Sequence, residues 1–292
     1  MSFNGIKQVV DAELEGRYRI SEFFKTPNQV TTAGVWYDLT GSGTNQPKAK
    51  QWFDASPLVA QQITHTADGG IFHGKAVSPY QKVIRNLRIG SNSATGLPMG
   101  IHLMDYLLYY PSIEDGNTDL QEMVNEVLGV PVTLPRYTDG EGVQVMAVTI
   151  SSRTGGQKFY FTYTNSDGVS GRVSQTVTQN TAAAPGSVTT SATATNGSSG
   201  PFIGLQGGDR GVRSIESVQM LGADTGFFAL VLVKPLVFTQ LWEQGVVYDK
   251  DLLLLEGDLP VVEDDAYLSL VVCPNGSLSG VTIKGNLKVV WN

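Results

Sequence analysis

The sequence is poor in charge and has almost no cysteine. Asp, Glu, Lys and Arg make up 16% of the 292 residues, against roughly 25% in an average globular protein. The single cysteine, Cys273, rules out an intrachain disulfide, and its apolar neighbours predict a buried strand thiol rather than a nucleophile. The N-terminus has no basic segment followed by an apolar run, and no apolar stretch approaches ~18 residues. We therefore expect neither a signal peptide nor a membrane span, and synthesis in a cytoplasm.

The sequence also lacks an excess of basic residues. The net charge is −7. Residues 243–265 contain eight acidic residues and one basic residue, so the rest of the chain is neutral. Binding to nucleic acid depends on neutralising phosphates with Lys and Arg, so we expect no direct nucleic-acid partner. The acidic stretch consists of solvated loops or, alternatively, faces a basic patch on a partner.

No recognisable catalytic, cofactor or metal motif is present. His65 and His73 flank an Asp-Gly-Gly turn, but their spacing matches no standard zinc or iron site. The adjacent acids at 139–141 and 263–265 are predicted to be solvated loops, although a hydrolase or a Ca²⁺ site would use such carboxylates. The glycine-rich residues 204–211 lack the Lys-Ser/Thr ending of a phosphate loop. We predict that the protein is not an enzyme and that it has no catalytic, cofactor-binding or metal-binding residues.

The patterns that are present indicate β structure. Turn residues 165–168 join two strand-like runs into a hairpin, and short strands with Gly-rich turns are typical of sandwiches and jelly rolls. Residues 101–110 are apolar and fit either a strand or a buried helix. Residues 119–128 have apolar positions at helical spacing and predict the one clear helix, with Gly129 ending it. The other predicted strands are 82–89, 143–150, 159–164, 212–220, 226–234, 266–273 and 281–291.

These elements predict a mainly β chain: a jelly-roll-like β-sandwich with an N-terminal arm and one or two short helices. The arm is residues 1–29, in which apolar residues from Ile6 to Leu14 have helical spacing. It docks on its own domain or reaches a neighbour. Residues 30–292 form the elaborated sandwich, with a subdivision near residue 150 as an alternative.

Two further segments bear on function. Trp36, Tyr37, Trp52 and Phe53 lie in two aromatic-rich runs that we interpret as strands around a long loop. We expect these side chains to anchor a core, whereas exposed rings would stack on sugars. Residues 173–208 contain no charge, although disordered linkers usually carry enough charge to remain solvated. This segment is expected to lie against another surface, or else to form a flexible surface loop.

Several segments that cover most of the chain from about residue 30 onward can be taken together, and none is a chemical motif. They are residues 35–40, 45–47, 54–58, 68–74, 134–143, 211–218, 264–268 and 289–292. Together they resemble virion structural proteins of tailed bacteriophages. The resemblance implies a component of the virion, and we favour a capsid-associated decoration or cement protein.

This interpretation gives specific expectations. The protein would assemble in the host bacterial cytoplasm and reside in the virion. Its partners would be the major capsid protein and further copies of itself, most simply as a homotrimer. Contacts across subunit boundaries would stabilise the shell against the pressure of packaged DNA. The alternative is a tail or appendage protein that binds host glycans through Trp36, Tyr37, Trp52 and Phe53.

Overall fold

The computed structural model describes residues 3–50, 52, 54–189, 200–257 and 259–292. Its helices are short: α1 (Ile6–Leu14), η1 (Leu39–Gly41), α2 (His65–Asp68) and α3 (Leu252–Leu255). The strands are β1 (Tyr18–Thr26), β2 (Tyr37–Asp38), β3 (Thr44–Asn45), β4 (Gln61–Gln62), β5 (Lys82–Ser91), β6 (Met99–Glu114), β7 (Gln121–Glu122), β8 (Glu126–Val127), β9 (Val130–Pro131), β10 (Gln144–Thr149), β11 (Lys158–Asn165), β12 (Arg172–Val173), β13 (Val177–Thr178), β14 (Val212–Met220), β15 (Phe227–Leu241), β16 (Tyr248–Asp251), β17 (Tyr267–Cys273) and β18 (Ile283–Trp291).

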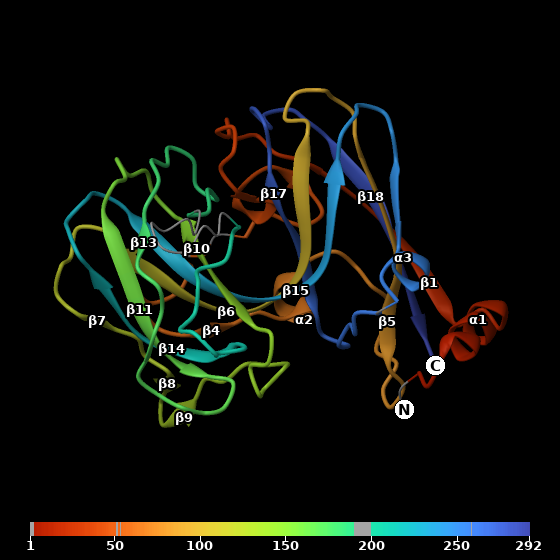
Figure 1. Cartoon of the computed structure of the whole chain (residues 1–292), viewed down its shortest axis with the longest axis horizontal. Helices are drawn as coiled ribbons and strands as arrows, with labels where there is room; N and C mark the ends of the chain where they lie inside the picture. Colours follow the sequence, from red (N-terminus) through yellow and green to blue (C-terminus); the bar gives the residue numbers. More distant parts are fainter. Residues whose placement is uncertain (1–2, 51, 53, 190–199, 258) are drawn as a thin grey trace.

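Three antiparallel sheets form the body of the molecule (Figure 1). Sheet A has the order β16-β5-β18-β1-β3, and sheet B has the order β10-β15-β6-β17-β2 with β4 paired to β6. Sheet C has the order β12-β11-β14-β7, with β13 paired to β11. Strands hold 43% of the residues and helices 7%. The predicted mainly β, sandwich-like fold with few short helices is therefore confirmed.

Sheet B joins the two ends of the molecule because its central strands are long. Strand β6 has 16 residues and β15 has 15, and their register shifts at three places along the pair. Such bulges let a long pair bend and twist. Pro235, which cannot donate a ladder hydrogen bond, lies at the third of these irregularities. The bent pair packs on sheet A along one part of its length and on sheet C along the other.

Three clusters of buried apolar residues fill the spaces around sheet B. The first lies between sheets A and B and includes Leu87 and Leu287 of sheet A and Leu270 of sheet B. The second lies between sheets B and C and includes Leu232 and Phe161. The third covers the remaining face of sheet B and is rich in aromatic residues. It includes Trp36, Trp52, Tyr106, Tyr109 and Tyr267.

Most predicted strands are present in the structure. Strands β5, β10, β11, β14, β17 and β18 occupy the predicted segments within a few residues, and β15 begins as predicted but continues seven residues further, to Leu241. The apolar segment at 101–110 is a strand, the centre of β6. The predicted hairpin after β11 is present, because β12 and β13 both pair with β11. By contrast, the described residues around Trp52 form turns rather than a strand.

The helix predicted for residues 119–128 is wrong. This segment contains β7 and β8, and β8 pairs with β9 as a small hairpin. The apolar residues at helical spacing do not form a buried stripe, because Leu120, Val124 and Leu128 are exposed. Gly129 has a positive φ of 79°, but it forms a hairpin turn instead of ending a helix.

The N-terminal segment docks on its own domain. Helix α1 forms as expected, and its Val9 and Ala12 pack on Val290 of β18. The chain then enters sheet A as β1, which pairs with β18 over eight residues. Of the two alternatives for the arm, the structure has the first. No helix among the described residues is long and apolar enough to cross a membrane.

Much of the uncharged segment 173–208 also packs inside this chain. Ala184 joins the first cluster, and Val188 joins the third and donates to the carbonyl of Trp36 at 2.8 Å. Ile203 is buried in the second cluster. Residues 190–199 lie outside the described part of the chain. Near residue 150, where a subdivision was the alternative, the chain passes from β10 of sheet B to β11 of sheet C.

Candidate functional site

The outer face of sheet A carries exposed apolar side chains. Alternation along β1 directs Phe23 into the first cluster and leaves Ile20 and Phe24 on the opposite face. The register places Phe24 opposite Lys284 and Ile20 opposite Lys288. Phe24 keeps 50% of its surface exposed, a high value for an aromatic residue in the middle of a sheet. We call this surface the outer face of sheet A.

Two adjoining hollows lie on the outer face of sheet A. The larger, of about 440 Å³, lies between Phe24, Val247 and the neighbouring polar side chains of β1, β5 and β18. The smaller, of about 220 Å³, lies beside Ile20. Both hollows are lined by Arg88 and Asn286. The lining mixes exposed apolar groups with charged rims, as protein-binding surfaces commonly do.

Ion pairs organise one edge of this face. Arg88 donates to Asp249 at 2.7 Å, and Arg85 pairs with Asp251 in the neighbouring strand β16. Burial disfavours the charge on Asp251, but hydrogen bonds from Arg85 and from backbone N–H groups outweigh that cost and lower the pKa of this carboxyl. Part of the acidic stretch therefore neutralises this chain's own arginines rather than remaining free for a partner.

Two charged side chains that line the larger hollow have no ion-pair partner among the described residues. Within the part of the chain that the structure describes, neither Lys284 nor Glu22 has an oppositely charged group within 4.0 Å. Lys288, in contrast, pairs with Glu13 of α1 at 2.9 Å and lies over the Tyr18 ring. The rim of the larger hollow thus has one free base and one free acid.

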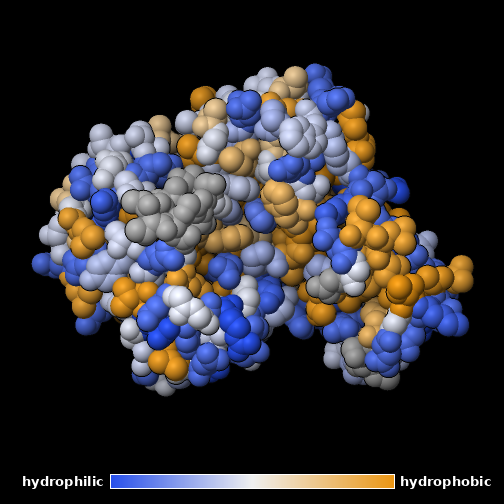
Figure 2. Space-filling model, viewed as in Figure 1, coloured by the Kyte–Doolittle hydropathy of each residue, from blue (hydrophilic) through white to orange (hydrophobic). Residues whose placement is uncertain are grey.

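A hydrophobic patch adjoins the outer face of sheet A. Figure 2 shows hydrophobic side chains gathered over α3 and α1 at one edge of the molecule. Leu254 is 77% exposed, and Leu255 and Ile6 are exposed as well. Leu253 and Val9 pack together beneath them and hold the two helices side by side. We call this surface the α1–α3 patch.

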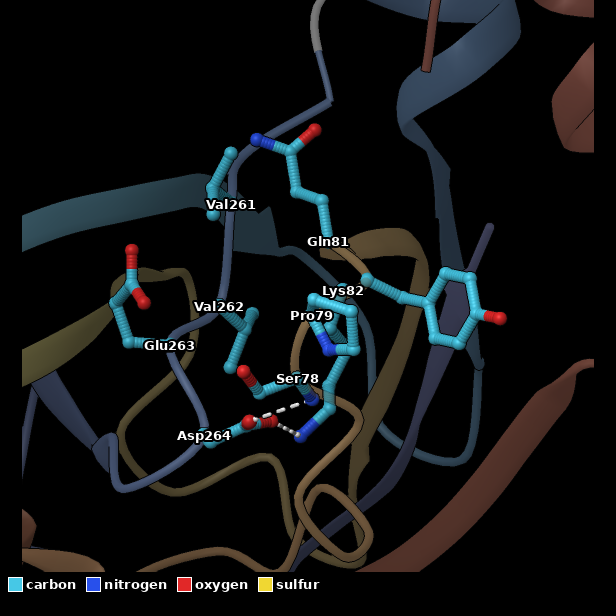
Figure 3. A pocket seen from close by; sticks show the side chains of 9 residues that line it. Ser78, Pro79, Gln81, Lys82, Val261, Val262, Glu263 and Asp264 are labelled. Carbon is cyan, nitrogen blue, oxygen red and sulfur yellow. Dashed lines mark hydrogen bonds and ion pairs between the residues drawn. The ribbon is translucent and has the colours of Figure 1, made fainter. Parts of the chain in front are cut away.

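A third concavity lies between the loop before β5 and the loop before β17 (Figure 3). Its volume is about 510 Å³, and its lining includes Lys82 and Asp264. The buried Lys82 ammonium lies 3.3 Å from Asp264 and 3.2 Å from Nδ1 of His73. Asp264 also accepts the backbone N–H groups of Val77 and Ser78 at 2.9 and 3.0 Å. These contacts fasten the two loops to each other.

The geometry of His73 assigns its tautomer. Its Nε2 lies 2.9 Å from the carbonyl oxygen of Ala266, which can only accept, so Nε2 carries the proton. Nδ1 then accepts from Lys82. Burial, followed by the charge of Lys82, lowers the pKa of His73 to about 4. Burial also lowers the pKa of Lys82, against the opposing effect of Asp264.

The structure brings the rings of His65 and His73 together, but neither nitrogen of His73 is available to bind a metal ion. The two rings are 5.2 Å apart, and both nitrogens of His73 already have partners within the chain. Among the residues described, no group of three or more His, Cys, Asp or Glu side chains is placed to hold a metal ion.

The acids considered as carboxylate pairs lie in separate loop contacts. Asp265 accepts from the backbone N–H and hydroxyl of Thr66, both at 2.8 Å. Asp139 caps the N–H of Glu141 at 3.0 Å. Asp209, in the glycine-rich 204–211 segment, binds Arg172 at 2.9 Å, which lowers the pKa of Asp209 to about 2. The contact of Asp139 stabilises a turn, and those of Asp265 and Asp209 hold distant segments together.

The aromatic residues considered for glycan stacking are in the core. Trp36, Tyr37 and Trp52 are 8%, 1% and 3% exposed. Trp52 stacks on Tyr106 with ring centroids 5.6 Å apart and donates to Asp38 at 2.8 Å. The expectation that these three anchor a core is confirmed. Phe53 lies outside the described residues.

Sequence reasoning missed the outer face of sheet A because it treated β1 as part of an arm. The alternation of Ile20, Glu22 and Phe24 with Ser21 and Phe23 was the available signal, and it is too short and mixed to stand out. It also missed the buried pair in which Arg136 holds Asp105 through two hydrogen bonds, at 2.7 and 2.8 Å. The two residues are 31 positions apart, so no local pattern connects them.

Comparison with known proteins gives no family. No protein-family model matches the chain, and no curated protein matches it. A search of solved structures finds "Structure of infectious bursal disease virus Gx strain" at 11% identity. The match covers 94% of this chain and 80% of that chain, with a TM-score of 0.16. A likeness this weak carries no argument about fold or function.

Proposed function

We propose that this chain is a structural protein of a bacteriophage virion, of the capsid-associated decoration or cement type. The observation that carries the proposal is the joint exposure of the outer face of sheet A and the α1–α3 patch. Apolar surface of this kind, rimmed by charge, is characteristic of sites that other proteins cover. The resemblance of many segments to virion proteins supports the same interpretation.

The scaffold suits a mechanical role. Sheet B is packed on both faces, and its two longest strands run through both halves of the molecule. A load applied to the α1–α3 patch passes through sheet A into this shared sheet. In the proposed mechanism, each copy buries its patch on the shell across subunit boundaries, and these contacts oppose the pressure of packaged DNA. The proposal includes no catalytic role.

The resemblance and the proposed contact surface use different residues. Several of the segments that carry the resemblance supply polar contacts inside the fold, including those of buried Asp38 and Arg136 and of partly buried Asp264. These residues determine the fold. Therefore the resemblance supports the protein type, whereas the exposed surfaces support the means of attachment.

The alternative of a glycan-binding tail or appendage protein gains no support from its predicted residues. Trp36, Tyr37 and Trp52 are buried, so their rings cannot stack on a sugar without disrupting the first or the third cluster. The proposal accordingly favours protein partners.

The proposal is tested on particles that lack the protein. Phage particles assembled without this chain should release DNA at a lower temperature, and added purified protein should restore the wild-type value. The double variant Leu254→Asn/Leu255→Asn should bind such particles at least about tenfold more weakly. Val173→Asn, which changes an exposed apolar residue on sheet C, is the matched control and should bind normally. If mass spectrometry detects no copy of this chain in purified wild-type virions, the proposal is contradicted.

A further inference from the structure

The β8–β9 hairpin presents an apolar tip that the fold of the monomer does not explain. Val127, Leu128 and Val130 are all exposed, and Leu128 is 98% exposed. Leu128 also has a φ of +52° and precedes Gly129 at +79°. Two central residues with positive φ form a type I′ turn, for which Asn-Gly is strongly preferred. A leucine there gains nothing from burial and adopts a left-handed conformation that disfavours branched side chains.

The base of the hairpin is firmly held, so the tip is presented rather than loose. Asn125 donates to the carbonyl of Ile215 at 2.7 Å and accepts from the hydroxyl of Tyr110 at 2.7 Å. Beyond it, Glu126 pairs with Pro131 and Val127 with Val130. A pre-organised apolar tip loses little conformational entropy when a partner buries it.

The charge around the hairpin is of one sign. Residues 114–135 contain five acidic residues and no basic residue. Glu126 flanks the tip and, among the described residues, has no ion-pair partner within 4.0 Å. The complementary charge lies at the opposite end of the molecule, on the outer face of sheet A. There Arg85, Arg88 and Lys288 are paired with acids of this chain, and Lys284 has no ion-pair partner among the described residues.

The larger hollow on the outer face of sheet A has the features that such a tip needs. It is walled by the apolar side chains of Phe24 and Val247, and Lys284 on its rim is free of ion pairs within the described chain. Arg88 on the same rim is engaged by Asp249, and Glu22 is the one acid in the lining. The free base that would meet Glu126 is therefore Lys284.

The tip and the hollow cannot meet within one molecule. In Figure 1, β8 and β9 lie at one end and the strands of sheet A at the other. We propose that the hairpin tip of one copy inserts into the larger hollow of a second copy, with Leu128 between Phe24 and Val247 and with Glu126 beside Lys284. This inference rests on the proposed function and specifies how two copies of the protein contact each other. The contact joins two different surfaces, so each copy can bind a further copy in the same way. Such a series closes into a ring, such as the expected trimer, when the rotation between successive copies returns to the first one.

The first test compares the self-association of the full chain with that of Leu128→Asn by sedimentation velocity. Asn suits the turn, so the variant keeps its fold while losing the apolar tip. The dissociation constant should rise at least about tenfold. Leu254→Asn, a change of the same kind at a residue that is 77% exposed in the α1–α3 patch, should leave self-association unchanged. Equal association by wild type and Leu128→Asn would overturn the proposal.

Charge reversal tests the orientation. Lys284→Glu alone and Glu126→Lys alone should each weaken association about tenfold through like-charge contact, and the double variant should return to within about threefold of wild type. A double variant as weak as the product of the two single effects would show that the two residues do not face each other, which would overturn the predicted geometry.

Directed crosslinking separates this arrangement from other contacts. In a Cys273→Ser background, Leu128→Cys and Phe24→Cys chains should form a disulfide-linked dimer only when mixed. Dimers of Leu128→Cys alone would indicate a two-fold contact and overturn the proposal, as would a wild-type chain that stays monomeric at every concentration. Binding of Leu128→Asn to particles that lack the protein measures the proposed function separately, since that binding uses the α1–α3 patch.

Discussion

Sheet B and sheet A differ in how completely the fold covers them. Sheet B packs on sheets A and C through one face and on the aromatic third cluster through the other. Sheet A packs on sheet B through one face. On its other face α1 covers Val290 of β18, whereas Ile20, Phe24 and Val247 stay exposed. Both sheets carry apolar residues on both faces, so composition alone does not distinguish them. The difference supports the proposal that a partner outside the monomer covers the second face of sheet A.

The same difference governs their charges. Asp105 of sheet B is fully buried and is held by Arg136, which also donates to two backbone carbonyls. Asp249 of sheet A meets Arg88 in the open, where water and salt screen the pair. A buried pair is costly to break because it leaves an uncompensated charge, whereas an exposed pair contributes little.

The largest expected effect comes from breaking the buried pair. Arg136→Ala should lower the free energy of unfolding by about 3–5 kcal/mol, because Asp105 loses its charged partner in a dry site. Urea denaturation followed by tryptophan fluorescence measures the change. Arg88→Ala is the matched control on sheet A and should cost no more than about 1 kcal/mol. Similar losses for both variants would mean that the two sheets do not differ as described.

Truncating apolar residues should separate the two sheets in the same way. Leu270→Ala in sheet B removes a fully buried side chain and should cost about 2–5 kcal/mol. Phe24→Ala on the outer face of sheet A should change stability by no more than about 0.5 kcal/mol. The same variant should weaken self-association, since Phe24 walls the larger hollow. Denaturation and sedimentation velocity on both variants test this pair of outcomes, and a large loss of stability for Phe24→Ala would contradict it.

Acid should weaken the junction between the two sheets through His73. The folded-state pKa of about 4 lies below the ordinary value near 6.5, so the unfolded chain binds more protons between these values. The stabilisation from neutral His73 is therefore fully present above pH 6.5 and is lost as the pH falls toward 4. Lowering the pH from 7 to 5 should cost about 2 kcal/mol through this group. In His73→Gln, that part of the pH dependence should vanish, and an unchanged dependence would contradict the assignment.

The smallest expected effect concerns the β8–β9 hairpin, which lies outside both sheets. Leu128→Asn should leave the free energy of unfolding unchanged or raise it by up to about 1 kcal/mol, because Asn tolerates positive φ better than Leu. Thermal unfolding of the isolated chain at low concentration measures this effect without self-association. A clear loss of stability would show that Leu128 supports the monomer after all.

The fold could be predicted from the sequence where local pattern and tertiary packing agree. Strand β11 alternates buried and partly exposed residues along its length, and the turn at 165–168 predicts the following hairpin. The segment 119–128 failed because its apolar spacing mimics a helix while Leu120, Val124 and Leu128 are surface residues of short strands. The spacing of apolar residues shows which of them could share one face of an element, but it does not show whether another element covers that face.

The candidate site could not be predicted because it depends on contacts between distant parts of the chain. The larger hollow needs β1 beside β18, a pairing of the two ends of the sequence. The contact between Lys82 and Asp264 joins residues 182 positions apart, 264 − 82. Low charge and the short N-terminal segment predict an assembling protein, but they do not specify which surface takes part.

The most direct test of the account is an electron cryo-microscopy reconstruction of the virion with this chain fitted into its density. The account predicts that the α1–α3 patch lies against the shell, that the outer face of sheet A is covered by a neighbouring subunit, and that the free surfaces belong to other parts of the molecule. A virion in which the α1–α3 patch and the outer face of sheet A both face solvent would contradict it.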